Sequence, residues 1–181
     1  MDLSAAMQHN SESSGGEIAV FAFGLGDIKL LRTALSSFCY CYVAKGGFLY
    51  LRHAGTANYD ETLYYSSQLS KDDSWRDGAK LFNDLRWLNS RAFTFDIHHR
   101  LAENIAAIHK KNNRHFGEIV SLCSSDIEFG IHRMFQSTWE GDGQPLSTVR
   151  DIESAVDFLK IDRKLLDRII AEVDKIESSQ S

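Results

Sequence analysis

Residues 118–135, EIVSLCSSDIEFGIHRMF, decide the fold of this chain. They open with a short apolar run, 118–123, of the kind that lies buried on both faces of a sheet. Ser125 or Asp126 is placed to cap the helix that follows. The inner face of that helix is expected to consist of four apolar residues: Ile127, Ile131, Met134 and Phe135. A strand that runs directly into a helix is the repeating unit of parallel sheets.

The same unit occurs on both sides of this stretch. Before it, residues 79–85 predict a strand and an amphipathic helix begins near Asp96. After it, residues 146–150 predict another strand, and Asp151 is placed to cap a further helix. Because strand-helix-strand crossovers are right-handed, these strands should run parallel and the helices should cover the sheet. The predicted fold class is α/β, a mixed sheet with parallel central strands and covering helices.

The first half of the chain predicts antiparallel strands. Residues 38–43 and 48–53 flank a Lys45-Gly46-Gly47 turn and should form a hairpin. A helix is expected to follow, capped by Asn58 and ending near Ser70. Upstream, residues 18–23 predict a strand, after which Asp27 should cap a short helix over residues 28–35.

A helix beginning at Asp162 closes the chain. It carries a wide apolar face, made of Leu165, Leu166, Ile169, Ile170, Val173 and Ile176. Such a face must pack on the body of the protein or on a second copy of the chain. We therefore expect a disordered leader, 1–16, and a single domain, 17–181, with an N-terminal strand-helix extension and an extra C-terminal helix.

Composition excludes several classes of function. The 181 residues carry a formal net charge of -5 without a basic cluster, which argues against nucleic acid as a partner. No apolar run approaches the roughly 20 residues of a membrane span, so stable membrane insertion is not expected. Cys39, Cys41 and Cys123 fit neither a disulfide framework nor a zinc motif, and indicate free thiols in a reducing, cytoplasmic compartment.

Four stretches carry a family resemblance, in order along the chain. Residues 48–55 form a strand ending in glycine, and residues 73–78 with 81–86 form a loop and a strand ending in Asp-Leu-Arg. Residues 125–135 contain Phe-Gly-x-x-Arg-Met, and residues 149–155 with 158–159 form a strand and a helix. Together they resemble the SpoIIAA-like branch of the STAS superfamily over about residues 48–159.

The resemblance implies a small cytoplasmic regulatory module that acts by binding rather than by catalysis. The sigma-factor antagonists of that family carry an Asp-Ser-Ser-Gly segment with a phosphorylated serine, whereas this chain has Ser-Arg-Ala-Phe-Thr-Phe-Asp at residues 90–96. Thr94 is the nearest hydroxyl by spacing, and a phosphate there would lie near a helix N-terminus. A plain helix cap explains Thr94 as well, and is favoured.

Sequence patterns for chemistry are weak. His99 and Glu103 have the i, i+4 spacing of two metal ligands, but no third ligand is evident, and a solvated polar face explains them. Gly24 and Gly26 lack the rest of a dinucleotide fingerprint, and no nucleophile elbow is present. We therefore predict no catalytic residue, no metal and no cofactor.

One candidate binding surface lies where the parallel strands end. Arginines at 86, 133 and 150 could converge there, with Trp87, on an anion or a partner carboxylate. A solvated surface explains these residues equally well. Gly130, inside a helix, suggests a close approach of the helix to the sheet or to a ligand. Close packing is favoured, so Gly130→Leu should unfold or strongly destabilise the domain. The whole predicted ligand or partner surface comprises Arg86, Trp87, Ser124, Ser125, Phe129, Gly130, Arg133, Met134 and Arg150.

Two functions of different classes follow from these observations. The first is a regulatory module that docks another protein or forms a homodimer through exposed helix faces, including the C-terminal one. The second is a carrier of a small lipid-like or acidic molecule, which a cavity lined by Phe129, Met134 and Trp87 would favour. An enzyme is a distant third, since no pair of titratable groups has acid and base spacing.

Overall fold

The fold is that of a computed structural model, which describes residues 17–56, 58–91, 93–139 and 145–179. The expected leader, 1–16, lies outside the described residues. The strands are β1 (Glu17–Phe21), β2 (Ile28–Arg32), β3 (Ser36–Val43), β4 (Phe48–Thr56), β5 (Ala79–Asn89), β6 (Phe116–Leu122) and β7 (Leu146–Val149). The helices are α1 (Tyr59–Lys71), α2 (Phe95–Lys111), α3 (Asp126–Trp139), α4 (Ile152–Leu159) and α5 (Arg163–Ser179).

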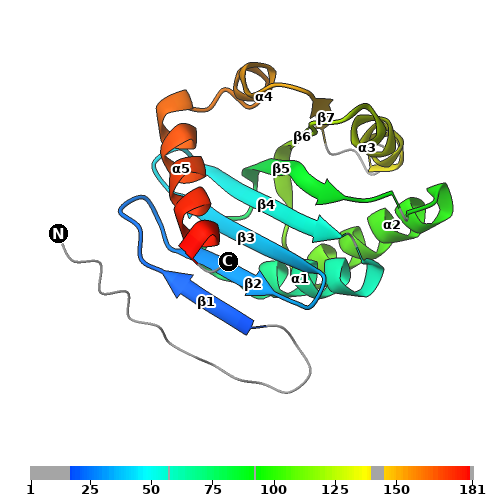
Figure 1. The fold of residues 1–181 in the computed structure, drawn as a ribbon, viewed down its shortest axis with the longest axis horizontal. Coiled ribbons are helices and arrows are strands. Elements are labelled where there is room, and N and C mark those ends of the chain that lie inside the picture. Colours follow the sequence, from blue (N-terminus) through cyan, green and yellow to red (C-terminus); the bar gives the residue numbers. More distant parts are fainter. Residues whose placement is uncertain (1–16, 57, 92, 140–144, 180–181) are drawn as a thin grey trace.

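The strands form a mixed seven-stranded sheet in sequential order, β1 to β7 (Figure 1). The first four strands pair antiparallel, and β4 to β7 pair parallel. The change of direction occurs at β4, because α1 is the first helical crossover in the chain. The predicted α/β class with parallel central strands is confirmed.

Helices cover both faces of the sheet. The face under α1, α2 and α3 holds a core cluster that includes Leu49, Leu51 and Leu81. The face under α4 and α5 holds a second cluster that includes Tyr50 and Phe82. Successive residues of one strand enter opposite layers because side chains alternate along a strand.

Local signals in the sequence explain the predicted elements that are confirmed. Gly46 and Gly47 donate their amides to the Val43 carbonyl oxygen at 3.0 and 2.9 Å, which closes the hairpin between β3 and β4. Gly47 has a φ of 64°, a conformation that glycine adopts without strain. The side chains of Asn58 and Asp151 accept amide hydrogen bonds at the starts of α1 and α4, as expected of N-caps.

The helix expected over residues 28–35 is wrong. Residues 28–32 are strand β2, which pairs with β1 on one side and β3 on the other. Ile28 and Leu30 face the layer under α5, whereas Leu31 faces the opposite layer. Two neighbouring strands supply hydrogen bonds to this backbone, so tertiary context overrides the helical spacing of its apolar residues.

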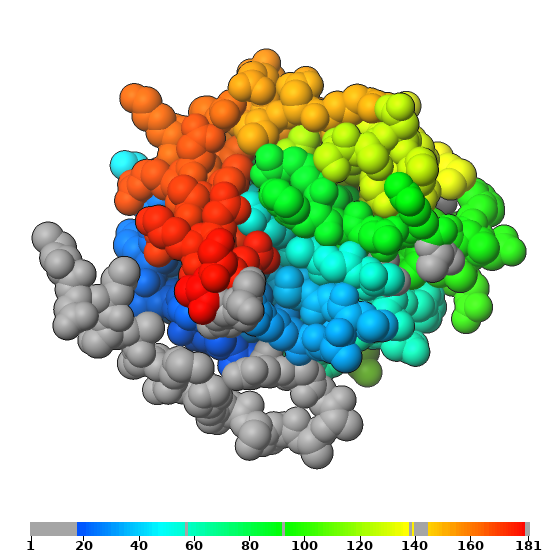
Figure 2. Space-filling view, in the orientation of Figure 1, coloured from blue at the N-terminus to red at the C-terminus, as the bar shows by residue number. Residues whose placement is uncertain are grey.

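The apolar face of α5 packs on the sheet of the same chain. Leu166, Ile169 and Val173 have 0% exposure. In the space-filling view α5, in orange and red, covers part of the strands coloured blue and cyan (Figure 2). Of the two expected partners of this face, the body of the protein is the one found, because side chains of β2 to β5 bury it.

The inner face of α3 differs from the predicted one. Ile127 and Met134 are 50% and 38% exposed, while Glu128 and Trp139 are buried. The helix is rotated from the apolar phase because Glu128 finds hydrogen-bond donors inside the protein. Gly130 lies on the exposed side, and a Cβ atom built on it would meet no atom of the described residues within 4 Å, so the expected close packing is wrong.

A buried ion network joins α5 to the sheet. The Arg52 guanidinium, 1% exposed, donates to Asp174 of α5 at 2.6 Å and to Glu177 at 3.0 Å. It also lies 3.4 Å from Asp84, which has 0% exposure. Burial acts to raise the pKa of Asp84, but hydrogen bonds from Arg86 and the charge of Arg52 bring it below its ordinary value. This network fixes the C-terminal helix over β4 and β5.

Candidate functional site

A pocket of about 130 Å³ lies between the sheet and helices α1, α2 and α3. Its walls come from β3 to β7, from the three helices and from the segment after β5. Apolar side chains such as Phe38, Leu101 and Phe135 form most of the surface. Pockets that hold small molecules have this composition, with a few polar groups set into an apolar wall.

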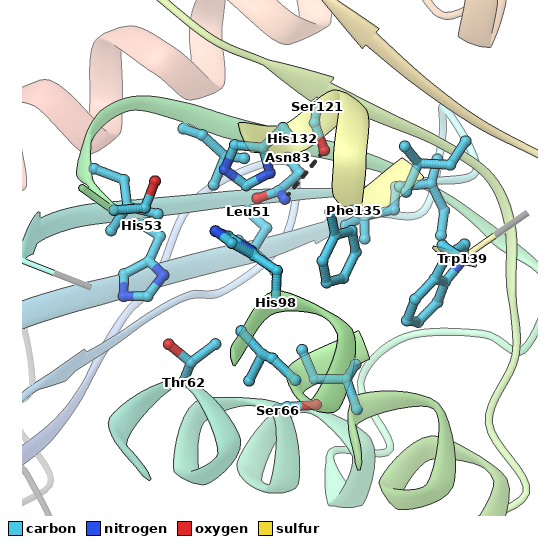
Figure 3. Close-up of a pocket in the computed structure, with 18 of the residues that line it drawn as sticks. Leu51, His53, Thr62, Ser66, Asn83, His98, Ser121, His132, Phe135 and Trp139 are labelled. Carbon is cyan, nitrogen blue, oxygen red and sulfur yellow. Dashed lines mark hydrogen bonds between the residues drawn. The ribbon is translucent and has the colours of Figure 1, made fainter. Parts of the chain in front are cut away.

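Polar side chains from the sheet and the helices lie in the pocket wall (Figure 3), and some of their atoms have no hydrogen-bond partner among the described residues. Within the described part of the chain, no hydrogen-bond partner reaches either ring nitrogen of His98 or Nε2 of His53 and His132. The same is true of Asn83 Oδ1 and Trp139 Nε1. A buried polar atom without a partner costs on the order of 1–3 kcal/mol, so such atoms call for an explanation. A polar group of a bound molecule would satisfy them.

The histidines of the pocket are held neutral. Burial lowers the pKa of His53 to about 4, and that of His132 to about 3, where His98 and His53 add a smaller effect. Burial lowers the pKa of His109 to about 4, with smaller contributions from the nearby Arg114 and His115 side chains. Burial also lowers the pKa of His98, although the charge of Glu128 opposes the shift. Each ring therefore offers one donor and one acceptor at neutral pH.

Glu128 positions α3 against the pocket. One carboxylate oxygen accepts from the Ser90 amide at 3.1 Å, and the other accepts from the Ser90 hydroxyl. Ser125 caps this turn, since its hydroxyl accepts from the Glu128 amide at 3.1 Å. The next turns of the helix then place His132, Phe135 and Trp139 in the pocket wall.

The residues of the predicted surface at the strand ends do not form one site, because they contact different neighbours. Arg86 and Trp87 lie inside β5, which extends beyond the predicted strand to Asn89. Arg86 donates two hydrogen bonds of 2.8 Å to Asp84, and its carbonyl oxygen accepts from Ser124 at 3.0 Å. Trp87 is 59% exposed, with the Arg52 guanidinium 5.9 Å from its ring centre.

The other two arginines contact different neighbours. Arg150 pairs with Asp126 and lies 4.3 Å from the centre of the Phe129 ring. Arg133 donates to Gln136 of its own helix at 2.9 Å. The structure thus joins Arg86 to Ser124 and Arg150 to Phe129, and gives each arginine its own acceptor. The pocket is not the cavity expected among Phe129, Met134 and Trp87, since it lies under the inner face of α3.

The remaining candidates have structural roles. Thr94 caps α2, because its hydroxyl accepts from the Ile97 amide at 3.4 Å; its phosphorylation stays a prediction. His99 and Glu103 form an exposed pair at 3.4 Å. Over the described ranges, no group of three or more His, Cys, Asp or Glu side chains is arranged to hold a metal ion.

The site residues predicted from the sequence include none of the residues that line the pocket. The signal that could have found them is a second helical phase in α3, in which Glu128, His132, Phe135 and Trp139 recur on one face. The inner face of α2 likewise carries His98, beside the exposed His99.

Comparison with known proteins gives no family. No protein-family model matches the chain, and a search of curated proteins finds no match. Among the helices of the described segments, none has the length and apolar character needed to cross a membrane.

Proposed function

We propose that this chain binds a small, mainly apolar molecule in the pocket between the sheet and helices α1 to α3. The observation that carries the proposal is a set of buried polar atoms, inside an apolar cavity, that have no hydrogen-bond partner among the residues that the structure describes. A cavity of roughly this size in another protein holds benzene. The ligand would therefore be compact, of about one ring.

Binding without catalysis fits the chemistry of the pocket. A general base works best when its pKa lies near the working pH. His53 and His132, with pKa values of about 4 and 3, are weak bases, and Glu128 is already engaged by Ser90. These groups are suited to orienting a ligand by hydrogen bonds rather than to moving a proton.

Membership of the SpoIIAA-like branch of the STAS superfamily is part of the proposal. The four resembling stretches coincide, in order along the chain, with β4, β5, α3 and the β7–α4 unit, and the three strands belong to one sheet. This order supports the proposal. A cytoplasmic location is proposed with it, because Cys39, Cys41 and Cys123 are buried free thiols.

The test measures binding of toluene and 4-methylphenol by ligand-observed NMR and calorimetry. Wild type should bind at least one of them with a dissociation constant in about the micromolar to millimolar range. Thr62, a partly exposed wall residue of α1, provides a matched pair of variants. Thr62→Phe should block the pocket, whereas Thr62→Val, which keeps the volume, should bind. Absence of binding to wild type, or equal binding by Thr62→Phe, would overturn the proposal.

A second candidate, docking of another protein or a second copy, rests on the outer face of α3. Ile127 and Met134 lie seven residues apart on this face, at 50% and 38% exposure. Sedimentation velocity of wild type against an Ile127→Ser, Met134→Ser double variant tests it. A concentration-dependent dimer lost in the variant supports docking, and a monomer in both overturns self-association.

A further inference from the structure

The pocket wall is free of permanent charge. Among the described residues that line it there is no Lys, Arg, Asp or Glu, and its four histidines are neutral at pH 7. Moving an ion from water into such surroundings without a counter-charge costs several kcal/mol. A ligand that carries a carboxylate or an ammonium group should therefore bind weakly in this pocket. This argues against the acidic ligand expected from the sequence.

Several aromatic rings form part of the pocket wall. His98 meets Phe93 edge to face at 5.1 Å between ring centres, and Phe135 stacks on Trp139 at 5.6 Å. A further ring placed among them can adopt the edge-to-face or offset contacts that aromatic pairs prefer. An aromatic guest thus gains more from this wall than an aliphatic guest of equal area.

The polar groups select a ligand that both donates and accepts. Asn83 Oδ1 is an acceptor only, and its amide nitrogen already donates to Ser121 Oγ at 3.5 Å. Figure 3 places His98 and His132 beside Asn83 in the same part of the pocket, and the two imidazole rings lie 6.2 Å apart. A hydroxyl can donate to the Asn83 oxygen and accept from an imidazole N–H at once.

We infer that the ligand is an uncharged hydroxylated aromatic molecule of the phenol class. Its ring lies among Phe93, Phe135 and Trp139, and its hydroxyl lies between Asn83 and His98. This inference rests on the proposed function and specifies the occupant of the same pocket.

The experiment compares four one-ring molecules at pH 7.5 by calorimetry: toluene, 4-methylphenol, benzoate and benzylammonium. 4-Methylphenol should bind wild type at least about tenfold more tightly than either ion. In Asn83→Leu, the ratio of the toluene to the 4-methylphenol dissociation constant should fall by about three- to tenfold, because one hydrogen bond to the hydroxyl is lost.

A second pair of variants tests the other polar contact and includes a control substitution on the same helix. His98→Phe removes the other polar contact and should also lower this ratio, whereas His99→Phe, on the exposed side of the same helix, should leave it unchanged. Binding by none of the four molecules overturns the proposed function itself. A ratio unchanged in folded Asn83→Leu and His98→Phe, or tightest binding by benzoate or benzylammonium, overturns the phenol assignment and leaves the pocket a binding site.

Discussion

The imidazole rings of His98 and His132 face each other edge to face, with centres 6.2 Å apart at an angle of 73°. His98 belongs to α2 and His132 to α3, so two helices on one side of the sheet meet through neutral polar rings. An aliphatic pair would serve stability better, since nitrogen atoms of both rings have no hydrogen-bond partner within the ranges that the structure describes. We attribute this arrangement to the pocket that the two rings line.

The protein should lose stability as the pH falls from 7 to 5. His53 and His109 titrate near 4 in the folded state, below the ordinary histidine pKa of about 6.5. Well above pH 6.5 the rings are neutral in both states and this contribution to stability is fully present. Between about pH 6.5 and pH 4 the histidines of the unfolded chain take up protons that the folded rings do not, so stability falls. Urea denaturation should show a loss of about 2 kcal/mol per buried histidine by pH 5.

One variant separates this effect from the titration of other groups. His53→Leu should flatten the pH dependence, because it removes one of the buried rings. Equal denaturation midpoints for wild type at pH 7 and pH 5 would contradict the buried, neutral histidines.

Removing the Arg52 side chain should strongly destabilise the protein. Arg52→Met removes one of the two guanidinium groups that contact Asp84, which has 0% exposure, and leaves Arg86. It also removes the ion pairs that Arg52 forms with Asp174 and Glu177 of α5. Loss of one partner from a buried ion pair costs about 3–5 kcal/mol. The exposed pair of Arg163 and Asp167 provides the control, since Asp167→Asn should change the free energy of unfolding by under about 1 kcal/mol. Comparable small effects of both variants would argue against the network.

Gly130→Ala should stabilise the protein by about 0.5–1 kcal/mol. The position is exposed within α3 and the added Cβ meets no atom within 4 Å, so the helix gains alanine propensity without a clash. Gly55→Ala is the opposite case, because its Cβ would lie 2.5 Å from the Leu35 carbonyl oxygen at a φ of 94°. Thermal melts should therefore move in opposite directions, and a lower melting temperature for Gly130→Ala would contradict the open environment.

Ile169→Asp should unfold the protein rather than separate a dimer. The side chain is fully buried between α5 and the sheet, and an unpaired charge there costs several kcal/mol. Lys175→Asp, at a side chain that is 72% exposed on the same helix, should remain folded. A folded Ile169→Asp with a smaller sedimentation coefficient would restore the idea of a docking helix.

Much of the fold follows from local signals in the sequence. The Gly46-Gly47 turn and the capping residues Asn58 and Asp151 act through hydrogen bonds to their own neighbours, so they can be recognised without tertiary information. The strand over residues 28–32 could not be recognised in this way, because pairing with β1 and β3 stabilises it. Helix spacing and strand alternation are ambiguous over so short a segment.

The candidate site was hidden for a related reason. Ile127 and Met134 have the spacing of an inner face, yet Glu128 and Trp139 occupy it. Glu128 is tolerated inside because Ser90, 38 residues earlier in the chain, donates to it. A prediction from hydrophobic periodicity assigns carboxylate and imidazole side chains to the surface. It therefore fails for a pocket that is lined by buried histidines.

The most direct test of the pocket as a binding site uses the indole N–H signals of the three tryptophans. Trp139 lines the pocket, and no residue in the described part of the chain accepts from its Nε1. Trp75 donates to the Leu69 carbonyl oxygen at 2.8 Å, and Trp87 is exposed. In a ¹H–¹⁵N correlation spectrum titrated with 4-methylphenol, the Trp139 indole signal should shift and saturate while those of Trp75 and Trp87 stay in place. A shift confined to Trp87, or none at a saturating concentration, would contradict the account.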